Sequence, residues 1–98
     1  MKQSIRLTSN TPLPLAELVA EALANETRVA ESNIRQVMGR LAEFEARYSM
    51  RSEQFEERYQ AGELEQEPDW EEWLVGIRAL ERLIEQSEAL KGIKIEEE

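Results

Sequence analysis

The chain is 98 residues long, with 41% hydrophobic residues, 34% charged residues and a formal net charge of −9. This length and composition describe at most one small, well-solvated helical domain and exclude a disordered chain. The core of so small a domain is modest, so we expect a second copy or a partner to share it. The chain contains no cysteine and no histidine, which excludes a disulfide framework, a thiolate nucleophile, and the commonest zinc ligand and general base.

The first predicted element is a short strand near the N-terminus. Ile5 and Leu7 alternate with polar or basic residues, and this period of two is typical of a half-buried strand. Prolines at positions 12 and 14 end any strand there. The polar side of the strand carries Lys2, Ser4 and Arg6.

Two helices are predicted next. The first begins at Pro14, because proline fits the first helical turn, where its missing N–H costs nothing. Its apolar face consists of Leu15, Leu18, Val19, Ala22 and Leu23. A break is predicted at residues 25–28, which contain two poor helix formers, although the absence of a glycine there leaves one long helix as the alternative.

The second helix is predicted from about Ala30 to Tyr48. Gly39 lies inside it and either allows close packing or is a tolerated surface glycine. The apolar face of this helix carries Ile34, Val37, Met38, Leu41, Phe44 and Tyr48.

A short third helix is predicted from Ser52, which is positioned to cap it, to Gly62, which is placed to end it in a left-handed conformation. Phe55 and Tyr59 lie four residues apart and share one face of this helix. Residues 63–68 then form an acidic connector.

A fourth helix is predicted to open at Asp69, with Glu72 placed as in a capping box, and to end at Gly92 before a tail, residues 93–98, that is expected to fray. It has the broadest apolar stripe of the chain: Trp70, Trp73, Leu74, Ile77, Leu80, Leu83 and Ile84. The expected fold class is therefore mainly α, a short N-terminal strand followed by about four amphipathic helices in a dimeric protein.

The excess negative charge lies entirely in the second half of the chain. Residues 1–47 carry six basic and six acidic side chains, whereas residues 48–98 carry six basic and fifteen acidic ones. A block of one sign either meets a partner of opposite charge or forms a solvated face. We therefore divide the chain into residues 1–48, for dimerisation and candidate DNA binding, and residues 49–98, an acidic helical region for partner binding or packing.

No motif in the sequence supports catalysis. The carboxylates lie mostly on polar helix faces, and the sequence has no glycine-rich phosphate loop and no nucleophile arrangement, so solvated surface is favoured over an active site. The acidic residues 63–69 lack the spacing and the glycine of an EF-hand, which disfavours a metal site. We expect no cofactor, no small-molecule substrate and no membrane segment, and we expect a cytoplasmic location.

The two tryptophans have two interpretations. Each ring offers a large rigid apolar area with one N–H to satisfy, so the pair either fills the chain's own core or anchors an interface with a partner or a second copy. Few other elements exist to cover so wide a stripe. The candidate partner-binding residues are Trp70, Trp73, Leu74, Ile77, Leu80 and Ile84.

The polar side of the predicted strand is the candidate DNA-binding surface. A two-stranded ribbon fits the major groove, where lysine and arginine read guanine edges. A lone strand cannot bind in this way, so Lys2, Ser4 and Arg6 would contact operator DNA only in a dimer. Ile5 and Leu7 would form the contact of that dimer, and the alternative is an ordinary edge strand or a disordered start.

The first half of the chain resembles a known layout. The order of elements consists of a strand, then Leu13 and Pro14 with Glu17 soon after, then a helix, a turn and the run RVAESNIRQVM at residues 28–38. This order resembles the ribbon-helix-helix layout of small prokaryotic repressors and antitoxins. The resemblance covers about the first 48 residues and implies a DNA-binding dimer. The chain differs by adding residues 8–12 after the strand and by lacking the family's turn glycine and serine cap.

The second half carries more distinctive runs: FEARYSM at 44–50, FEERY at 55–59, AGEL at 61–64 and DWEEW at 69–73. These runs resemble a group of small archaeal and cyanobacterial proteins that are found as candidate antitoxins beside small toxins. The motifs are structural rather than catalytic. The resemblance implies the role of an antidote.

These patterns favour an antitoxin-like protein that regulates its own operon. The first half would dimerise and contact operator DNA, while the acidic second half would cover a basic toxin and inhibit it by occlusion. The alternative is a non-enzymatic helical scaffold, a homo-oligomer with no role in DNA binding. A small enzyme is the least favoured interpretation.

Overall fold

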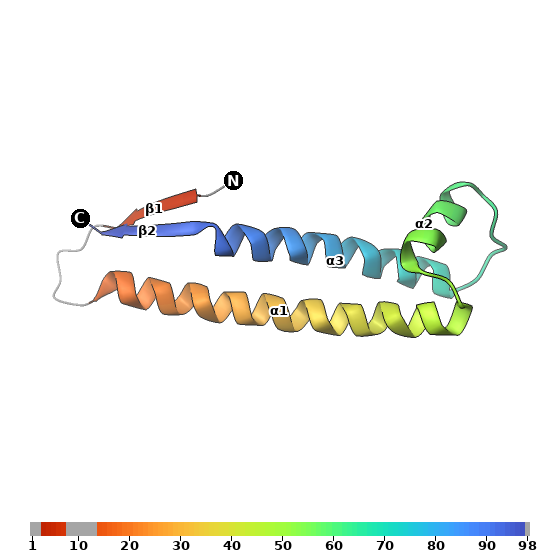
Figure 1. Cartoon of the computed structure of the whole chain (residues 1–98), viewed down its shortest axis with the longest axis horizontal. Helices are drawn as coiled ribbons and strands as arrows, with labels where there is room; N and C mark the ends of the chain where they lie inside the picture. The colour runs from red at the N-terminus through yellow and green to blue at the C-terminus, as the bar shows by residue number, and fades with distance from the viewer. Residues whose placement is uncertain (1–2, 8–13, 98) are drawn as a thin grey trace. The chain divides into compact units, whose positions relative to one another are not determined.

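The computed structural model describes residues 3–7 and 14–97. In these ranges the chain forms β1 (Gln3–Leu7), α1 (Leu15–Tyr48), α2 (Ser52–Gln60), α3 (Asp69–Lys91) and β2 (Ile93–Glu97) (Figure 1). The chain is mainly α, as its apolar periodicity indicates. The expected order of a short N-terminal strand followed by about four helices is wrong, because the described part of the chain contains three helices and a second strand, β2.

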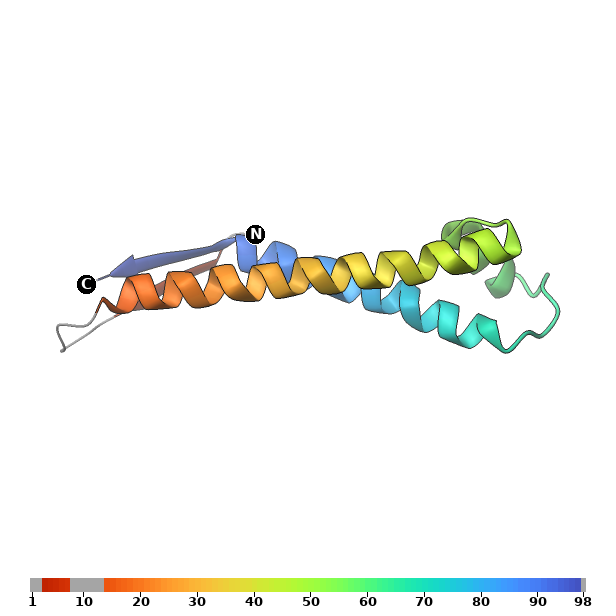
Figure 2. The same cartoon turned by 90° about the horizontal axis from the view of Figure 1, so that it is seen from below.

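α1 is one helix where two were predicted. Residues 25–28 continue it, and both views show it without a break (Figures 1 and 2). Within this segment the Thr27 hydroxyl donates a hydrogen bond to the Leu23 carbonyl one turn earlier, at 2.9 Å. Poor helix formers cost only up to about 0.7 kcal/mol each, which packing along a helix easily offsets. The turn between two helices that a ribbon-helix-helix layout needs is therefore replaced by helix.

The chain divides into two compact units. The first unit comprises residues 1–33 and 83–98, and the second unit comprises residues 34–82. Each unit contains a segment of α1 and a segment of α3.

The first unit contains a parallel pair of strands. β1 pairs with β2 in a register that places Gln3 beside Ile93 and Leu7 beside Glu97. β1 therefore has a partner strand within the chain, and the expectation that residues 93–98 fray is wrong for residues 93–97, which form β2. The helical segments of this unit bury the small residues Ala30 and Ser87.

The second unit contains the aromatic core. Its buried residues come from three helices: Leu41 and Phe44 from α1, Phe55 from α2, and Trp70, Trp73 and Ile77 from α3. The helices approach closely at Gly76, where an added Cβ would lie 3.0 Å from Leu41 Cδ2. Gly39 has no atom within 4 Å of an added Cβ, so close packing does not explain it.

Candidate protein-binding site

All six aromatic side chains of the chain gather in the second unit. We call them the aromatic cluster: Phe44, Tyr48, Phe55, Tyr59, Trp70 and Trp73. Trp73 stacks on Phe55 with ring centroids 4.0 Å apart and planes 6° apart, and on Phe44 at 5.5 Å. Such offset contacts each contribute about 0.5–1.5 kcal/mol beyond the area they bury. The cluster therefore gives this unit a rigid centre.

Each tryptophan N–H in the cluster has a partner. Trp73 Nε1 donates to the Ser52 hydroxyl at 3.0 Å, and Trp70 Nε1 donates to the Glu65 carbonyl at 2.6 Å. The Ser52 backbone N–H in turn donates to Glu45 Oε2 at 2.8 Å. A buried donor without a partner is costly, so these bonds fix the orientation of both rings. They also hold the connector residue Glu65 against α3.

The tryptophans are core residues of this chain. Trp73 is 0% exposed and Trp70 is 7% exposed, and Ile77 is buried beside them. Leu74 and Leu80 are partly buried against the same cluster, whereas Ile84 is exposed and belongs to the first unit. Three of the six predicted partner-binding residues, Trp70, Trp73 and Ile77, are therefore core residues of this chain. The interpretation of Trp70 and Trp73 as intrachain core describes their position.

The predicted DNA-binding and dimer residues lie in and near β1. Lys2 lies outside the described residues, Ser4 is exposed, and Arg6 follows it in the strand. Ile5 and Leu7 lie in the same strand, at register positions opposite Ile95 and Glu97 of β2. β1 thus pairs within the chain, in parallel with β2, and its pairing with a second copy stays a prediction.

Asp69 joins α3 to the end of α1 in the second unit. Its Oδ2 accepts hydrogen bonds from Arg47 Nη1 at 2.7 Å and from the Tyr48 hydroxyl at 2.6 Å. The bond from Tyr48 is the main cause that lowers the pKa of Asp69, followed by the bond from Arg47. The same contacts raise the pKa of Tyr48 and of Arg47. Asp69 is therefore ionised and engaged within the unit.

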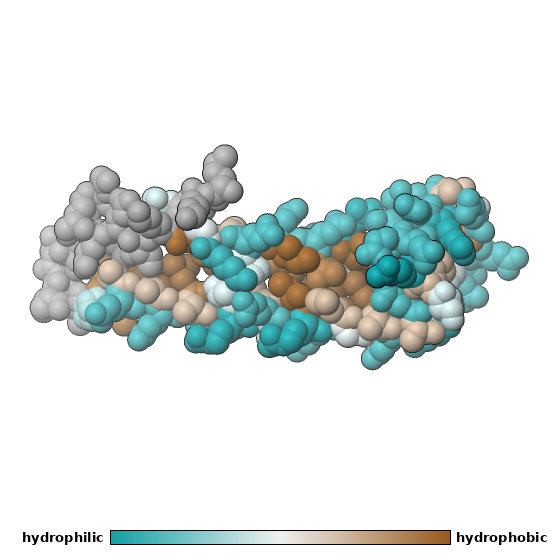
Figure 3. Space-filling model, in the orientation of Figure 1, coloured by the Kyte–Doolittle hydropathy of each residue, from teal (hydrophilic) through white to brown (hydrophobic). Residues whose placement is uncertain are grey.

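The surface over α2 and the connector is strongly acidic. Residues 52–72 carry nine acidic side chains and one basic side chain, Arg58. Figure 3 shows hydrophilic side chains gathered over α2. Asp69, Glu72 and Glu56 pair with arginines of the second unit. The other six are exposed, form no salt bridge with another described side chain, and constitute what we call the acidic rim: Glu53, Glu57, Glu63, Glu65, Glu67 and Glu71.

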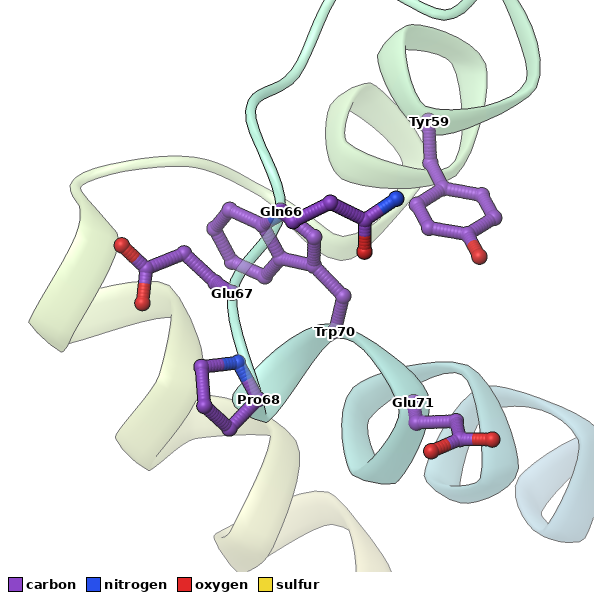
Figure 4. A pocket seen from close by; sticks show the side chains of 6 residues that line it. All are labelled: Tyr59, Gln66, Glu67, Pro68, Trp70 and Glu71. Atoms are coloured by element: carbon purple, nitrogen blue, oxygen red, sulfur yellow. The ribbon is translucent and has the colours of Figure 1, made fainter.

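A pocket of about 420 Å³ opens at the acidic rim. It is lined by Tyr59, Gln66, Glu67, Pro68, Trp70 and Glu71 (Figure 4). In this view the Gln66 amide is directed toward the Tyr59 ring, and the Trp70 indole lies between Tyr59 and Glu67. The pocket thus combines aromatic surface with carboxylates at its edge.

The C-terminus of α2 positions Tyr59 and the connector. Gly62 adopts φ 71°, its N–H donates to the Tyr59 carbonyl at 3.1 Å, and the Glu63 N–H donates to the Arg58 carbonyl at 3.0 Å. This pair of bonds is the Schellman motif, which satisfies the last carbonyls of a helix and turns the chain sharply. The prediction that Gly62 ends this helix in a left-handed conformation is confirmed.

The chemistry of this site is electrostatic. Among residues 3–7 and 14–97, no group of three or more aspartate or glutamate side chains is arranged to hold a metal ion. In the same ranges, no helix has an apolar stretch of the length and hydrophobicity needed to span a membrane. A rigid aromatic pocket edged by carboxylates suits the binding of a cation with an apolar stem.

Comparison with protein-family models, curated proteins and solved structures finds no match to the chain.

Sequence reasoning missed the pocket and two contacts that shape the site. Ser52 was expected to cap α2, but it serves as the buried acceptor for Trp73. Asp69 was expected to act in a capping box, but its carboxylate holds Arg47 and Tyr48. The acidic connector was visible in the sequence, whereas its position beside Tyr59 depends on how α2 and α3 pack.

Proposed function

We propose that this chain is a non-catalytic, antitoxin-like protein whose acidic rim covers a basic surface of a partner protein in the cytoplasm. The observation that carries this proposal is the charge of residues 52–72, nine acidic side chains to one arginine, set on a rigid aromatic core. Inhibition would come from occlusion, since an acidic cover denies a basic substrate-binding surface to its substrate. No bond is made or broken.

The acidic rim favours such a partner because its six carboxylates repel one another. A basic surface relieves this repulsion on binding and is steered toward the rim over a distance of about 8–10 Å at ordinary ionic strength. Exposed ion pairs contribute only about 0–1 kcal/mol each, so the rim supplies orientation and association rate more than affinity. Tight binding needs a central contact in addition.

The pocket at the rim supplies that contact. A lysine or arginine side chain of the partner can lay its methylene stem on the aromatic surface and place its charge beside Glu67 or Glu71. A cation over the face of Tyr59, which is 39% exposed, adds about 0.5–1 kcal/mol. Interface hot spots have this form, a fully seated side chain surrounded by weaker polar contacts.

Operator DNA is not part of this proposal, because the partner strand of β1 in the structure is β2 of the same chain. The apolar stripe of α3 is not the docking element in this proposal, because its two tryptophans, Trp70 and Trp73, are buried in the core. The partner surface in this proposal is the rim and its pocket.

A growth assay tests the proposal. The chain is co-expressed with the product of each neighbouring gene, and we expect one of these products to arrest growth alone and to be neutralised by this chain. The Glu67→Gln/Glu71→Gln variant should lose neutralisation and bind the purified partner at least about tenfold more weakly, which corresponds to about 1.4 kcal/mol.

A matched control carries the same change of charge outside the pocket. Glu81→Gln/Glu85→Gln removes two exposed carboxylates of α3 that do not line the pocket, and it should neutralise normally. Equal losses in both variants would contradict a specific pocket. If no neighbouring product is neutralised, the antitoxin-like role is wrong and the helical scaffold remains.

A further inference from the structure

α1 exposes large hydrophobic side chains on a second side of the helix in the first unit. Leu18 is 49% exposed and Val29 is 46% exposed, although both are large hydrophobic residues. They are 11 residues apart, which is about three helical turns, so they lie on the same side of the helix. The α1 outer stripe, as we call it, continues between and beside them with alternating spacings of three and four residues: Leu15, Leu18, Ala22, Asn25, Val29 and Ser32.

This spacing is the a and d pattern of a coiled-coil seam. Val19 and Leu23 on the inward side of α1 are half-buried within the unit, whereas Ala22 and Asn25 of the outer stripe are exposed. A helix that is apolar on two sides has a second face to cover. Within the part of the chain that the structure describes, the outer stripe is therefore exposed from Leu18 to Val29 and half-buried at its two ends, Leu15 and Ser32.

The stripe is complementary to itself when a second α1 runs antiparallel to it. In the register that places Leu18 opposite Val29 of the second copy, Ala22 meets Asn25 and Leu15 meets Ser32. Every a position then faces a d position, as antiparallel seams require, and each contact occurs twice about a two-fold axis. The two bulkiest contacts, Leu18 with Val29, flank the small Ala22 and the polar Asn25 at the centre.

The flanking charges select the same arrangement. Glu21 and Arg28 are exposed and lie along one edge of the outer stripe. In the antiparallel register Glu21 of one copy meets Arg28 of the other, twice. In a parallel pair Glu21 would instead meet Glu26 of the second copy, which is repulsive.

We propose that the α1 outer stripe docks a second copy of this chain in an antiparallel helix pair. The stripe spans 18 residues, residues 15–32, or about 27 Å of helix. A contact of this length lies at the small end of protein interfaces, so the dimer is expected to be reversible, with a Kd in the micromolar range of about 1–100 µM. This self-association is independent of the acidic rim, so its failure would leave the proposed partner binding untouched.

Disulfide trapping tests the arrangement directly, because the natural chain has no cysteine. We expect a mixture of Leu18→Cys and Val29→Cys proteins to form a mixed disulfide rapidly under mild oxidation. Each variant alone should cross-link slowly, because identical positions lie about 16 Å apart along an antiparallel pair. Rapid self-cross-linking of Leu18→Cys would indicate a parallel pair and overturn the proposal.

Charge reversal gives a second measurement by sedimentation equilibrium. Glu21→Arg and Arg28→Glu should each weaken self-association by about tenfold or more, because each creates two like-charge contacts per dimer. An equimolar mixture of the two variants should regain the dimer, because opposite charges then face each other. A natural chain that stays monomeric up to 500 µM, roughly five times the weakest expected Kd, or a mixture that gains nothing, would show that a second copy does not bind here.

Discussion

The indole N–H of Trp73 donates a hydrogen bond to the hydroxyl of Ser52, 3.0 Å away, and both residues are buried. The bond links α3 to the first residue of α2. The backbone N–H of Ser52 donates to Glu45 Oε2 on α1, so three helices meet at one serine. The position of α2, and with it Tyr59 and the pocket, therefore depends on this contact.

Replacing Ser52 by alanine is expected to destabilise the second unit. The change leaves the Trp73 N–H buried without an acceptor, which costs about 1–3 kcal/mol. Urea unfolding followed by circular dichroism measures the free energy of unfolding.

A double-mutant cycle separates this bond from other effects of the serine. In a Trp73→Phe background the N–H is absent, so Ser52→Ala should cost much less than in the natural chain. An equal cost in both backgrounds would show that the bond is not the cause.

Local features of this fold are predictable from the sequence, and the packing of α2 is not. Gly62 ends α2 because its left-handed conformation is a property of a few adjacent residues. The break expected at residues 25–28 rested on small helix propensities, which the continuous apolar face of α1 outweighs. The burial of Trp70 and Trp73 depends on where α2 folds back, and no local pattern encodes that.

The same limit applies to the candidate site. The acidic connector is evident from composition, since residues 63–68 contain three glutamates. Its arrangement as a rim beside Tyr59 arises from the Ser52 contact and the turn at Gly62, which bring together residues of different elements. Sequence periodicity identifies faces of helices, but it does not identify which loops border them.

The two glycines inside helices are expected to respond differently to alanine. Gly39→Ala should raise the free energy of unfolding by roughly 1 kcal/mol, because alanine is the better helix former and the added Cβ meets no atom within 4 Å. Gly76→Ala should gain less or destabilise, since its Cβ would lie 3.0 Å from the buried Leu41 side chain. Thermal unfolding of both variants gives the comparison, and an equal gain at both sites would contradict close helix packing at Gly76.

The two helix ends with positive φ predict opposite effects of glycine. Ser49 follows α1 with φ 51°, a conformation that costs a non-glycine residue about 1 kcal/mol, so Ser49→Gly should stabilise the chain by a similar amount. Gly62→Ala should destabilise it by about 1 kcal/mol, because Gly62 holds φ 71°. Thermal unfolding again measures both, and destabilisation by Ser49→Gly would show that strain is absent there.

Asp69 is expected to make the free energy of unfolding of the second unit decrease at low pH. Its folded pKa lies below the ordinary value of 3.8, chiefly because the Tyr48 hydroxyl and then Arg47 donate hydrogen bonds to the carboxylate. A lowered folded pKa means that the unfolded chain binds the proton more readily. The stabilisation is therefore present above pH 3.8 and is lost as the pH falls through the folded pKa.

The Asp69→Asn variant isolates this contribution from that of the other carboxylates. The natural chain should exceed the variant in free energy of unfolding at neutral pH, and the difference should shrink as the pH falls below 3.8. The pKa of Tyr48 is raised above its ordinary value of 10.0, first because its hydroxyl donates a hydrogen bond to Asp69. The stability that this bond gives the folded chain is therefore expected to fall as the pH rises above 10.0 and through the folded pKa of Tyr48. Urea unfolding from acid to alkaline pH measures both changes in the free energy of unfolding. If the difference between the natural chain and Asp69→Asn stays constant in acid, the hydrogen bonds from Tyr48 and Arg47 do not lower the pKa of Asp69.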